Sequence, residues 1–585
     1  MAAVPRPEHP RPDRLRKNWL SLNGPWRFAF DEKNVGNQEG WYREKTYPLE
    51  IQVPFAYQSE LSGINDQKHC DVIWYEREFA VPDALRSLRR LLHFGAADYR
   101  ADVWLDGQYL GGHEGGYTPF SFDITDLTAG KNFCRITVRC EDRLDFDQPR
   151  GKQSYRPEPF ACWYTPVSGI WQSVWLEGVG EYYPVDFRLT PHIETGSVKV
   201  EAELNGLPPE GKLRLTARYK GKLTARQEIT VTSDRFIQTE LYMNHDETLN
   251  GIRLWRPGNP ALYDLTLETL SGDTVSDTVD TYFGFRRIEV SGGHVMLNQD
   301  VFYQRLILDQ GYWPDGLLTA PSDEALKKDV ELTLALGFNG ARKHQKFEDP
   351  RYLYWADHLG LAVWSELPSA YWLRDSEKRN MIRDLSEAIK RDYNHPCIIT
   401  WTPLNESWGV PYIRFQKEAQ QLADALYHLI HALDGTRPVS GNDGWELAAT
   451  DLVTIHDYTG RPEELSRDYQ DREALLRTQL GTGRMVSAEG YCHHGKPLLL
   501  TEYGGIAMAK DLGENGWGYN EAEKDEESFL DRFAAITRAF RHMPGFQGYC
   551  YTQLTDVFQE VNGLLDMDRR PKVSIDAIRG INLER

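Results

Sequence analysis

Residues 395–406 read HPCIITWTPLNE, and this stretch decides how the second half of the chain is interpreted. Its apolar run leads without a turn signal into the polar residues Asn405 and Glu406. The same arrangement returns at 496–504, KPLLLTEYG, where an apolar run leads into Glu502. Short apolar runs of this kind are typical of buried parallel strands, and functional side chains follow the carboxyl ends of such strands. The two stretches therefore predict two buried strands that each end in a carboxylate.

Outward from these stretches, short apolar strands alternate with amphipathic helices. Ser322 precedes a segment with the apolar periodicity of a helix. Asp349 precedes a second such helix, which Gly360 ends. The strand candidates are 303–308, 338–341, 361–364, 398–404, 437–441, 452–455, 497–501 and 546–551. Eight strands that alternate with helices predict a (β/α)8 TIM barrel. An open doubly wound sheet is the alternative, but no Gly-rich phosphate-binding fingerprint follows a strand.

The first half of the chain shows short strands and almost no helical periodicity. Asp106-Gly107 between two apolar runs predicts a tight hairpin, because both turn positions favour positive φ. The alternation in 197–204, SVKVEAEL, predicts a half-buried strand. We therefore predict a β-sandwich at 1–180, an immunoglobulin-like β-sandwich at 181–286 and a catalytic barrel at 287–585.

Composition excludes several classes of partner. Asp and Glu number 87 against 67 Lys and Arg, a net charge of −20, so a broad basic surface for nucleic acid or anionic membrane is not expected. No apolar run is long enough to span a membrane, and the N-terminal residues lack the apolar region of a signal peptide. The 7 cysteines are scattered without a C-x-x-C pair, which favours a reducing compartment. We expect a cytoplasmic, multidomain protein.

Glu406 and Glu502 are the candidate catalytic residues. They follow the fourth and seventh predicted strands, whose carboxyl ends face each other across the mouth of a TIM barrel. Two carboxyl groups about 5–5.5 Å apart are the machinery of a retaining glycosidase, with one group as acid/base and the other as nucleophile.

The sequence resembles glycoside hydrolase family 2, the group of β-galactosidases, β-glucuronidases and β-mannosidases, along nearly its whole length. The matching motifs are 22–26 (LNGPW), 112–120 (GHEGGYTPF), 167–176 (VSGIWQSVWL), 254–263 (LWRPGNPALY), 282–286 (YFGFR), 337–342 (GFNGAR), 395–406 and 496–504. The resemblance implies a jelly-roll domain at 1–180, with Glu406 as acid/base and Glu502 as nucleophile. Glu406 must then hold a proton, so we expect its pKa to be raised by burial or by the Glu502 charge.

The resemblance also implies supporting residues. Asn405 is expected to hydrogen-bond the sugar 2-hydroxyl, and Tyr458 to steady the nucleophile. Arg342 ends the second strand and is expected to hold Glu502 ionised. His344 is a weaker candidate, because many relatives have Arg-x-x-His where this chain has Arg-Lys-His. The further candidates for contacting the sugar are Asp309, His456 and Tyr503, with Trp372, Trp408 and Tyr551 as stacking residues.

Departures from the family pattern bear on the substrate. Glucuronidases of the family carry an Asn-x-Lys pair for the sugar carboxylate, whereas 560–563 here reads EVNG, with no lysine and an acid in Glu560. Large β-galactosidases bind magnesium through a Glu and a His after the third strand, and 364–369 here has no following His in register. We therefore expect no essential metal, no cofactor and low activity on glucuronides.

The sequence as a whole predicts a retaining exo-β-glycosidase with a carbohydrate substrate, β-D-galactosides first. The alternatives within the family are α-L-arabinofuranosidase, β-glucuronidase and β-mannosidase. The alternative from another class is a non-catalytic carbohydrate-binding protein, against which the presence of both Glu406 and Glu502 counts. By analogy with relatives, the candidate assemblies are a homodimer and a homotetramer. The polar stretch 511–526 is a candidate active-site lid, with a solvated surface loop as its alternative.

Overall fold

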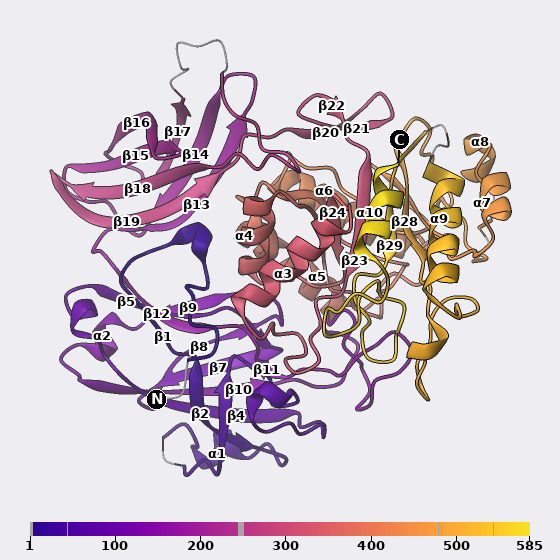
Figure 1. Cartoon of the computed structure of the whole chain (residues 1–585). Coiled ribbons are helices and arrows are strands. Elements are labelled where there is room, and N and C mark those ends of the chain that lie inside the picture. Colours follow the sequence, from indigo (N-terminus) through magenta and orange to yellow (C-terminus); the bar gives the residue numbers. More distant parts are fainter. Residues whose placement is uncertain are drawn as a thin grey trace.

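The computed structural model describes residues 4–43, 45–243, 251–477, 479–480, 482–541, 543 and 545–584. Figure 1 shows three parts: an N-terminal β-domain (indigo to purple), a second β-domain (magenta) and a barrel with surrounding helices (orange to yellow). Both β-domains lie against the same side of the barrel. Among the described residues no helix is long and apolar enough to cross a membrane.

The N-terminal domain is a sandwich of antiparallel sheets. Alternation in sequence explains it: β5 (Arg89–Phe94) buries every second side chain between the sheets. The predicted hairpin is confirmed, since Asp106 and Gly107 both have positive φ and join β7 (Arg100–Leu105) to β8 (Gln108–Glu114). The remaining elements are β1 (Trp19–Ser21), β2 (Gly24–Phe30), α1 (Gly36–Glu39), β3 (Leu49–Val53), β4 (Val72–Ala80), β6 (Ala97–Asp98), β9 (Phe120–Asp123), α2 (Thr125–Thr128), β10 (Phe133–Glu141), β11 (Gly169–Ile170) and β12 (Val174–Val179).

The second domain packs one three-stranded and one four-stranded antiparallel sheet around its own apolar core. Its strands are β13 (Pro184–His192), β14 (Ser197–Leu204), β15 (Gly211–Tyr219), β16 (Lys222–Val231), β17 (Phe236–Tyr242), β18 (Tyr263–Ser271) and β19 (Thr274–Phe283). A small sheet follows and packs Ile288, Val295 and Leu297 against one end of the barrel interior. It consists of β20 (Ile288–Ser291), β21 (His294–Leu297) and β22 (Asp300–Val301).

The barrel strands form a parallel sheet in the order β26-β25-β24-β23-β29-β28-β27. They are β23 (Gln304–Asp309), β24 (Gly340–Lys343), β25 (Ala362–Glu366), β26 (Ile398–Thr402), β27 (Val453–His456), β28 (Leu498–Gly504) and β29 (Phe546–Thr552). The predicted fifth strand, 437–441, forms bridges rather than a regular strand: Val439 pairs with Trp401 of β26. Gly444 then accepts a hydrogen bond from His456 N of β27, so this segment closes the sheet into a barrel.

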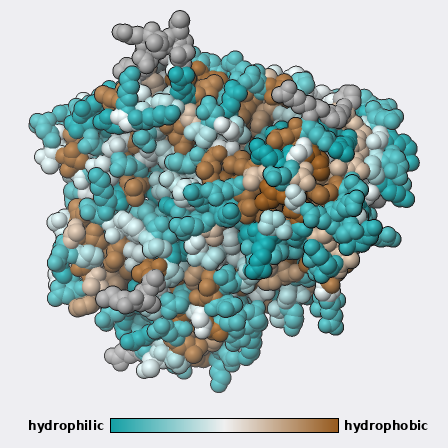
Figure 2. Space-filling view, in the orientation of Figure 1, coloured by the Kyte–Doolittle hydropathy of each residue, from teal (hydrophilic) through white to brown (hydrophobic). Residues whose placement is uncertain are grey.

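Helices surround the barrel (Figure 1). They are α3 (Asp323–Ala335), α4 (Pro350–Leu359), α5 (Asp375–Asp392), α6 (Lys417–Leu433), α7 (Pro462–Asp468), α8 (Arg472–Leu475), α9 (Glu526–Arg541) and α10 (Ile575–Leu583). The predicted caps are confirmed: Ser322 accepts from Ala325 N, Asp349 accepts from Arg351 N, and Gly360 ends α4 in the left-handed region. In Figure 2 hydrophilic residues cover most of the visible face, and hydrophobic ones gather over the barrel around α10. The predicted fold class is confirmed.

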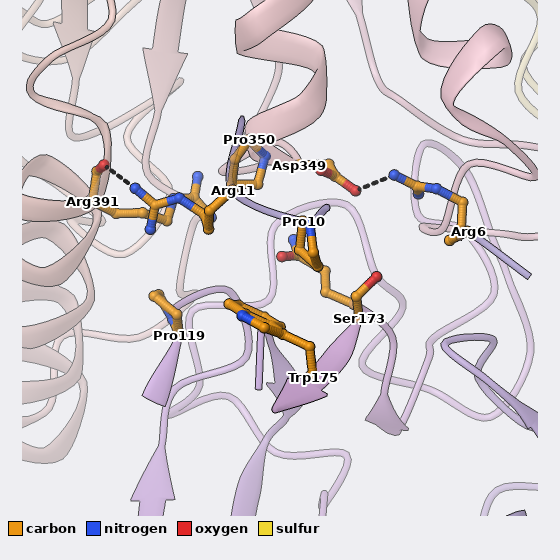
Figure 3. Close-up of a pocket in the computed structure, with 11 residues that line it drawn as sticks. Arg6, Pro10, Arg11, Pro119, Ser173, Trp175, Asp349, Pro350 and Arg391 are labelled. Atoms are coloured by element: carbon orange, nitrogen blue, oxygen red, sulfur yellow. Dashed lines mark hydrogen bonds and ion pairs between the residues drawn. The ribbon is translucent and has the colours of Figure 1, made fainter. Parts of the chain in front are cut away.

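The N-terminal segment, 4–18, ties the first domain to the barrel. Figure 3 shows it passing between Trp175 of β12 and the start of α4, where Arg6 bonds Asp349 at 3.0 Å. Arg11 donates to the carbonyl oxygen of Arg391 in α5 at 3.2 Å. These charge-assisted contacts fix the orientation of the N-terminal domain on the barrel.

Candidate active site

The candidate catalytic side chains meet at the carboxyl ends of the barrel strands. Arg342 lies in β24, Glu406 just beyond β26, His456 at the end of β27 and Glu502 within β28. Parallel strands place their carboxyl ends at one mouth of a barrel, so residues far apart in sequence converge there.

Glu502 is held from two sides. The hydroxyl of Tyr458 donates to Oε2 at 2.6 Å, and Arg342 Nη1 lies 3.3 Å from Oε1. Only 6% of the Glu502 side chain is exposed. A buried carboxylate with a cation and a hydroxyl donor is stabilised in its charged form and fixed in one rotamer.

Glu406 is positioned by an unusual turn. Glu406 and Ser407 have φ of 55° and 62°, in the left-handed region that residues with a Cβ seldom adopt. The turn is fixed by the segment after the fifth predicted strand: Glu406 N donates to Asp443 O at 2.9 Å, and Ser407 N donates to Asn442 Oδ1 at 3.0 Å. The Glu406 side chain keeps 20% of its surface exposed.

His456 connects the two carboxylates. Its Nδ1 lies 2.9 Å from Glu406 Oε1 and 3.4 Å from Glu502 Oε2, and its Nε2 lies 2.8 Å from Asp443 Oδ2. Because ionised carboxylates only accept, both ring nitrogens donate when Glu406 and Asp443 are ionised, and the ring is then an imidazolium. Burial opposes this charge, but Glu502, Asp443 and Glu406 outweigh burial and raise the pKa of His456 to about 10.

The expected rise in the Glu406 pKa is wrong. Burial alone would raise it, but the hydrogen bond and charge of His456, with smaller effects of Lys152 and His344, lower the pKa of Glu406 to about 2. One oxygen of Glu406 and one of Glu502 lie within 4.8 Å of each other and of a His456 nitrogen. Such a close approach is nearer to the separation of about 5–5.5 Å in retaining glycosidases than to the wider one of inverting glycosidases.

Arg342 organises the floor of the site and is fully buried. Its guanidinium bonds Glu366 Oε1 at 2.7 Å and Asp443 Oδ2 at 2.9 Å. It also donates to Asn405 Oδ1 at 3.1 Å. Although burial opposes its charge, Asp443, Glu366 and Glu502 raise the Arg342 pKa well above its usual value. Among the described residues, Asn405 Nδ2 is buried without a hydrogen-bond partner, so this donor is available to a ligand.

Further sequence candidates, described by their contacts and exposure, are Asp309, His344, Trp372 and Trp408. Asp309 already bonds Lys343 Nζ at 2.7 Å and Gly311 N at 2.9 Å, so both its oxygens have protein partners. His344 bonds Glu366 Oε2 at 2.9 Å and contributes to the charge around Glu406. Trp408 is half-buried, and Trp372 is 46% exposed beyond β25.

Two candidates are corrected: Tyr503 and Tyr551 do not face the site. Both are fully buried, and their rings contact each other on the outer side of the strands, beneath α9. Tyr503 OH bonds Thr537 Oγ1 of α9 at 2.9 Å, and Tyr551 packs on Phe533 of α9. Successive residues of a strand point to opposite faces, so Glu502 inside the barrel places Tyr503 outside.

Several residues at the barrel mouth were not predicted from the sequence. Tyr519 stacks on Tyr458 with ring centroids 3.5 Å apart, so part of the 511–526 stretch covers the nucleophile side of the site. From the N-terminal domain, Tyr164 donates to Glu560 Oε2 at 2.6 Å. Lys152 is also buried at the mouth, and burial is outweighed by Cys162, Glu560, Glu406 and Glu502, which raise its pKa.

In the part of the chain that the structure describes, two groups of side chains have ligand atoms close enough to hold a metal ion. In the first, the contacts of Glu406, His456 and Glu502 are already explained by shared protons. In the second, Asp357 bonds Tyr282 OH at 2.8 Å and His395 Nδ1 at 2.6 Å, which joins the second β-domain to the barrel. In this second group the Nε2 of His395 is buried and has no hydrogen-bond partner among the described residues.

A TIM barrel with two carboxylates this close at its mouth, preceded by two β-sandwiches, defines a retaining glycoside hydrolase. Three family models match: the sugar binding domain of glycosyl hydrolases family 2 at residues 19–176, the family 2 domain itself at 183–286 and the family 2 TIM barrel domain at 319–581. The chain therefore belongs to glycosyl hydrolases family 2.

Similar proteins include some named β-glucuronidase and some named β-galactosidase. A β-glucuronidase of Paenibacillus borealis is 25% identical over 97% of both chains. A β-galactosidase of Thermoanaerobacter pseudethanolicus is 26% identical over 92% of this chain and 71% of its own. The solved β-glucuronidase of Ruminococcus gnavus superposes with a TM-score of 0.79 at 20% identity, covering 99% of this chain and all of that one, which demonstrates a common fold.

Proposed function

We propose that the protein hydrolyses a terminal β-linked sugar by double displacement, with Glu502 as nucleophile and Glu406 as acid/base. The single observation that carries this assignment is the approach of the two carboxylates to within 4.8 Å. Their surroundings also divide the roles: Glu502 has a cation and a hydroxyl donor, whereas Glu406 is partly open to solvent.

In the first step a Glu502 oxygen attacks the anomeric carbon while Glu406 gives a proton to the glycosidic oxygen, and the aglycone leaves. In the second step Glu406 takes a proton from water, the hydroxide attacks the anomeric carbon, and the bond to Glu502 breaks. Tyr458 supports the carboxylate that attacks and later leaves. Asn405 Nδ2, which has no partner among the described residues, is assigned to the sugar 2-hydroxyl.

His456 supplies the proton that Glu406 gives to the leaving group in the first step. In the free site the shared proton rests on His456, because Glu406 is the stronger acid of the two. When the glycosidic oxygen approaches Glu406, that proton moves along the 2.9 Å hydrogen bond from Nδ1 to Oε1 and onward to the leaving oxygen. Once Glu502 is glycosylated its charge is gone, and an ionised Glu406 beside His456 is ready to accept a proton from water.

The first candidate substrate is a neutral sugar, with β-D-galactosides foremost. The supporting observation is Glu560, a buried carboxylate at the mouth that is bonded by Tyr164 and by Asn562 Nδ2 at 3.2 Å. A carboxylate held in this way accepts hydrogen bonds from sugar hydroxyls and repels a uronic acid.

The second candidate substrate is a β-glucuronide, and Lys152 is the observation in its favour. Its ammonium is buried beside the Cys162 thiol and among acidic groups, and among the described residues no salt bridge joins it to a carboxylate. A buried ammonium without a close counter-charge is suited to bind a substrate carboxylate. This cation comes from the N-terminal domain and is thus distinct from the lysine that family glucuronidases carry before their final stretch.

A panel of p-nitrophenyl glycosides, assayed with and without EDTA, tests this proposal. The panel comprises the β-galactoside, β-glucuronide, β-glucoside, β-mannoside and α-L-arabinofuranoside. We expect the β-galactoside to dominate and EDTA to have no effect. Dominant glucuronide hydrolysis that Lys152→Met abolishes would select the second candidate, and no turnover of any member would contradict both.

A further inference from the structure

A segment of the N-terminal domain, 150–164, lies directly on the barrel mouth. Arg150 N and Gly151 N donate to Ser369 O at 3.1 and 3.0 Å, beyond β25. At the far end of the segment, Gln559 Nε2 donates to Ala161 O at 2.7 Å, beyond β29. Gly151 has a φ of 61°, and a Cβ there would lie 2.2 Å from Gln345 O, so only glycine permits this close approach.

This segment completes a continuous run of aromatic side chains, which we name the aromatic wall. Trp163 contacts Trp408 with ring centroids 5.3 Å apart and donates through Nε1 to Tyr371 OH at 2.6 Å. Outward from Trp163 the neighbouring centroids are 4.8–5.4 Å apart. In order the wall consists of Trp408, Tyr371, Trp163, Phe160, Tyr155, Phe146 and Trp372.

The wall retains accessible ring surface. Trp372 is 46% exposed, and Tyr155, Phe160 and Trp408 are half-buried. Aromatic side chains from two domains are thus held together and partly exposed, with Arg156 over Phe160 and Arg374 over Trp372. Hydrophobic surface of this kind, continuous with a catalytic centre, is typical of a ligand-binding face.

The position of the wall relative to the two carboxylates decides which part of a substrate it meets. An acid/base must touch the oxygen that joins the sugar to the leaving group, so the leaving group lies on the Glu406 side. Trp408 follows Glu406 by two residues and begins the wall. Tyr519, stacked on Tyr458, covers the centre beside Glu502.

We propose that the aromatic wall is a leaving-group subsite for flat aromatic aglycones, which it binds by ring stacking. This inference rests on the proposed function, because it takes Glu406 as the acid/base. The wall offers mainly ring faces, and Trp163 Nε1 is already bonded to Tyr371 OH, which favours a flat aryl group over a second sugar with many hydroxyls.

The test compares leaving groups that share one sugar. The glycosyl fluoride has no ring to stack, the 4-methylumbelliferyl glycoside has a large flat ring, and the corresponding disaccharide has a polar one. Trp372→Ala and Tyr155→Ala should each lower kcat/KM for the 4-methylumbelliferyl glycoside about ten-fold more than for the fluoride. Trp372→Phe, which keeps a ring, should recover most of that loss.

The matched control is Phe133→Ala, which removes an aromatic ring that is 62% exposed on β10, outside the wall. It should leave all three substrates unchanged. Equal losses on fluoride and aryl substrates would overturn the subsite, and a loss confined to the disaccharide would overturn its aryl specificity. Failure of the wild-type protein to cleave the fluoride would contradict the proposed function instead, so the two failures are distinguishable.

Discussion

The two sides of the catalytic centre are built differently. On one side Glu502 is 6% exposed, bonded by Tyr458 and paired with Arg342. On the other side Glu406 is 20% exposed, lies on a turn with positive φ and has one side-chain partner, His456. A nucleophile has to stay charged and fixed, whereas an acid/base has to exchange protons with a leaving group and with water. The structure therefore restrains one carboxylate and leaves the other accessible.

Removing the restrained carboxylate is expected to have the largest effect. Glu502→Ala eliminates the covalent route and should lower kcat by on the order of 10⁴-fold or more for every substrate. Thermal unfolding should show that the fold persists, because the Arg342 side chain keeps Glu366 and Asp443 as partners. Activity close to wild type would remove Glu502 from the nucleophile role.

Removing the accessible carboxylate should have an effect that depends on the leaving group. Glu406→Ala should lower the rate by about 10²–10⁴-fold for substrates with poor leaving groups, which need a proton. Aryl glycosides with acidic phenols should lose much less in the glycosylation step. Equal losses across a series of phenols, measured as kcat/KM against phenol pKa, would argue against an acid role for Glu406.

His456→Asn tests how the accessible carboxylate obtains its proton. In the wild type the shared proton is lost as pH rises through the raised His456 pKa of about 10, so kcat/KM should fall only near that pH. In the variant Glu406 holds the proton alone, and its pKa should lie near that of a carboxyl group beside a second charge. The alkaline limb should therefore move down by about two pH units or more. An unchanged profile would exclude His456 as the proton store.

Tyr458→Phe weakens the restraint on Glu502 without removing the carboxylate, so it should have the smallest effect of the four. The loss of one hydrogen bond to a charged group predicts a decrease of about 10–100-fold in kcat/KM. Arg342 still stabilises the charge. A loss as large as that of Glu502→Ala would mean that Tyr458 takes part in the chemistry itself.

The positions of Glu406 and Glu502 follow from sequence because strand ends in a barrel share one mouth. The same rule would have found Asp443, which comes directly after the fifth predicted strand. It could not separate Glu502 from Tyr503, since the direction of a strand side chain depends on register. An irregularity in the pairing of β28 with β29 between Leu500 and Tyr503, followed by the Tyr503–Tyr551 pair, places both tyrosines under α9.

Contacts between domains explain the rest of what sequence could not predict. Lys152 and Tyr164 reach the mouth from the N-terminal domain, and nothing in their local sequence indicates a partner such as Glu560, roughly 400 positions away. The low pKa of Glu406 likewise depends on the orientation of one histidine ring. Burial could be foreseen, but a hydrogen-bond network that outweighs it has to be observed.

The segment 150–164 has a consequence for how such an enzyme diversifies. The two carboxylates and the closest groups around them, Arg342, His456 and Tyr458, belong to the barrel, whereas Tyr155, Phe160 and Trp163 of the aromatic wall are encoded in a segment of a separate domain. Mutation, insertion or recombination in that segment can alter which molecule departs without touching the groups that break the bond. Selection can thus explore new leaving groups while the inherited reaction is preserved.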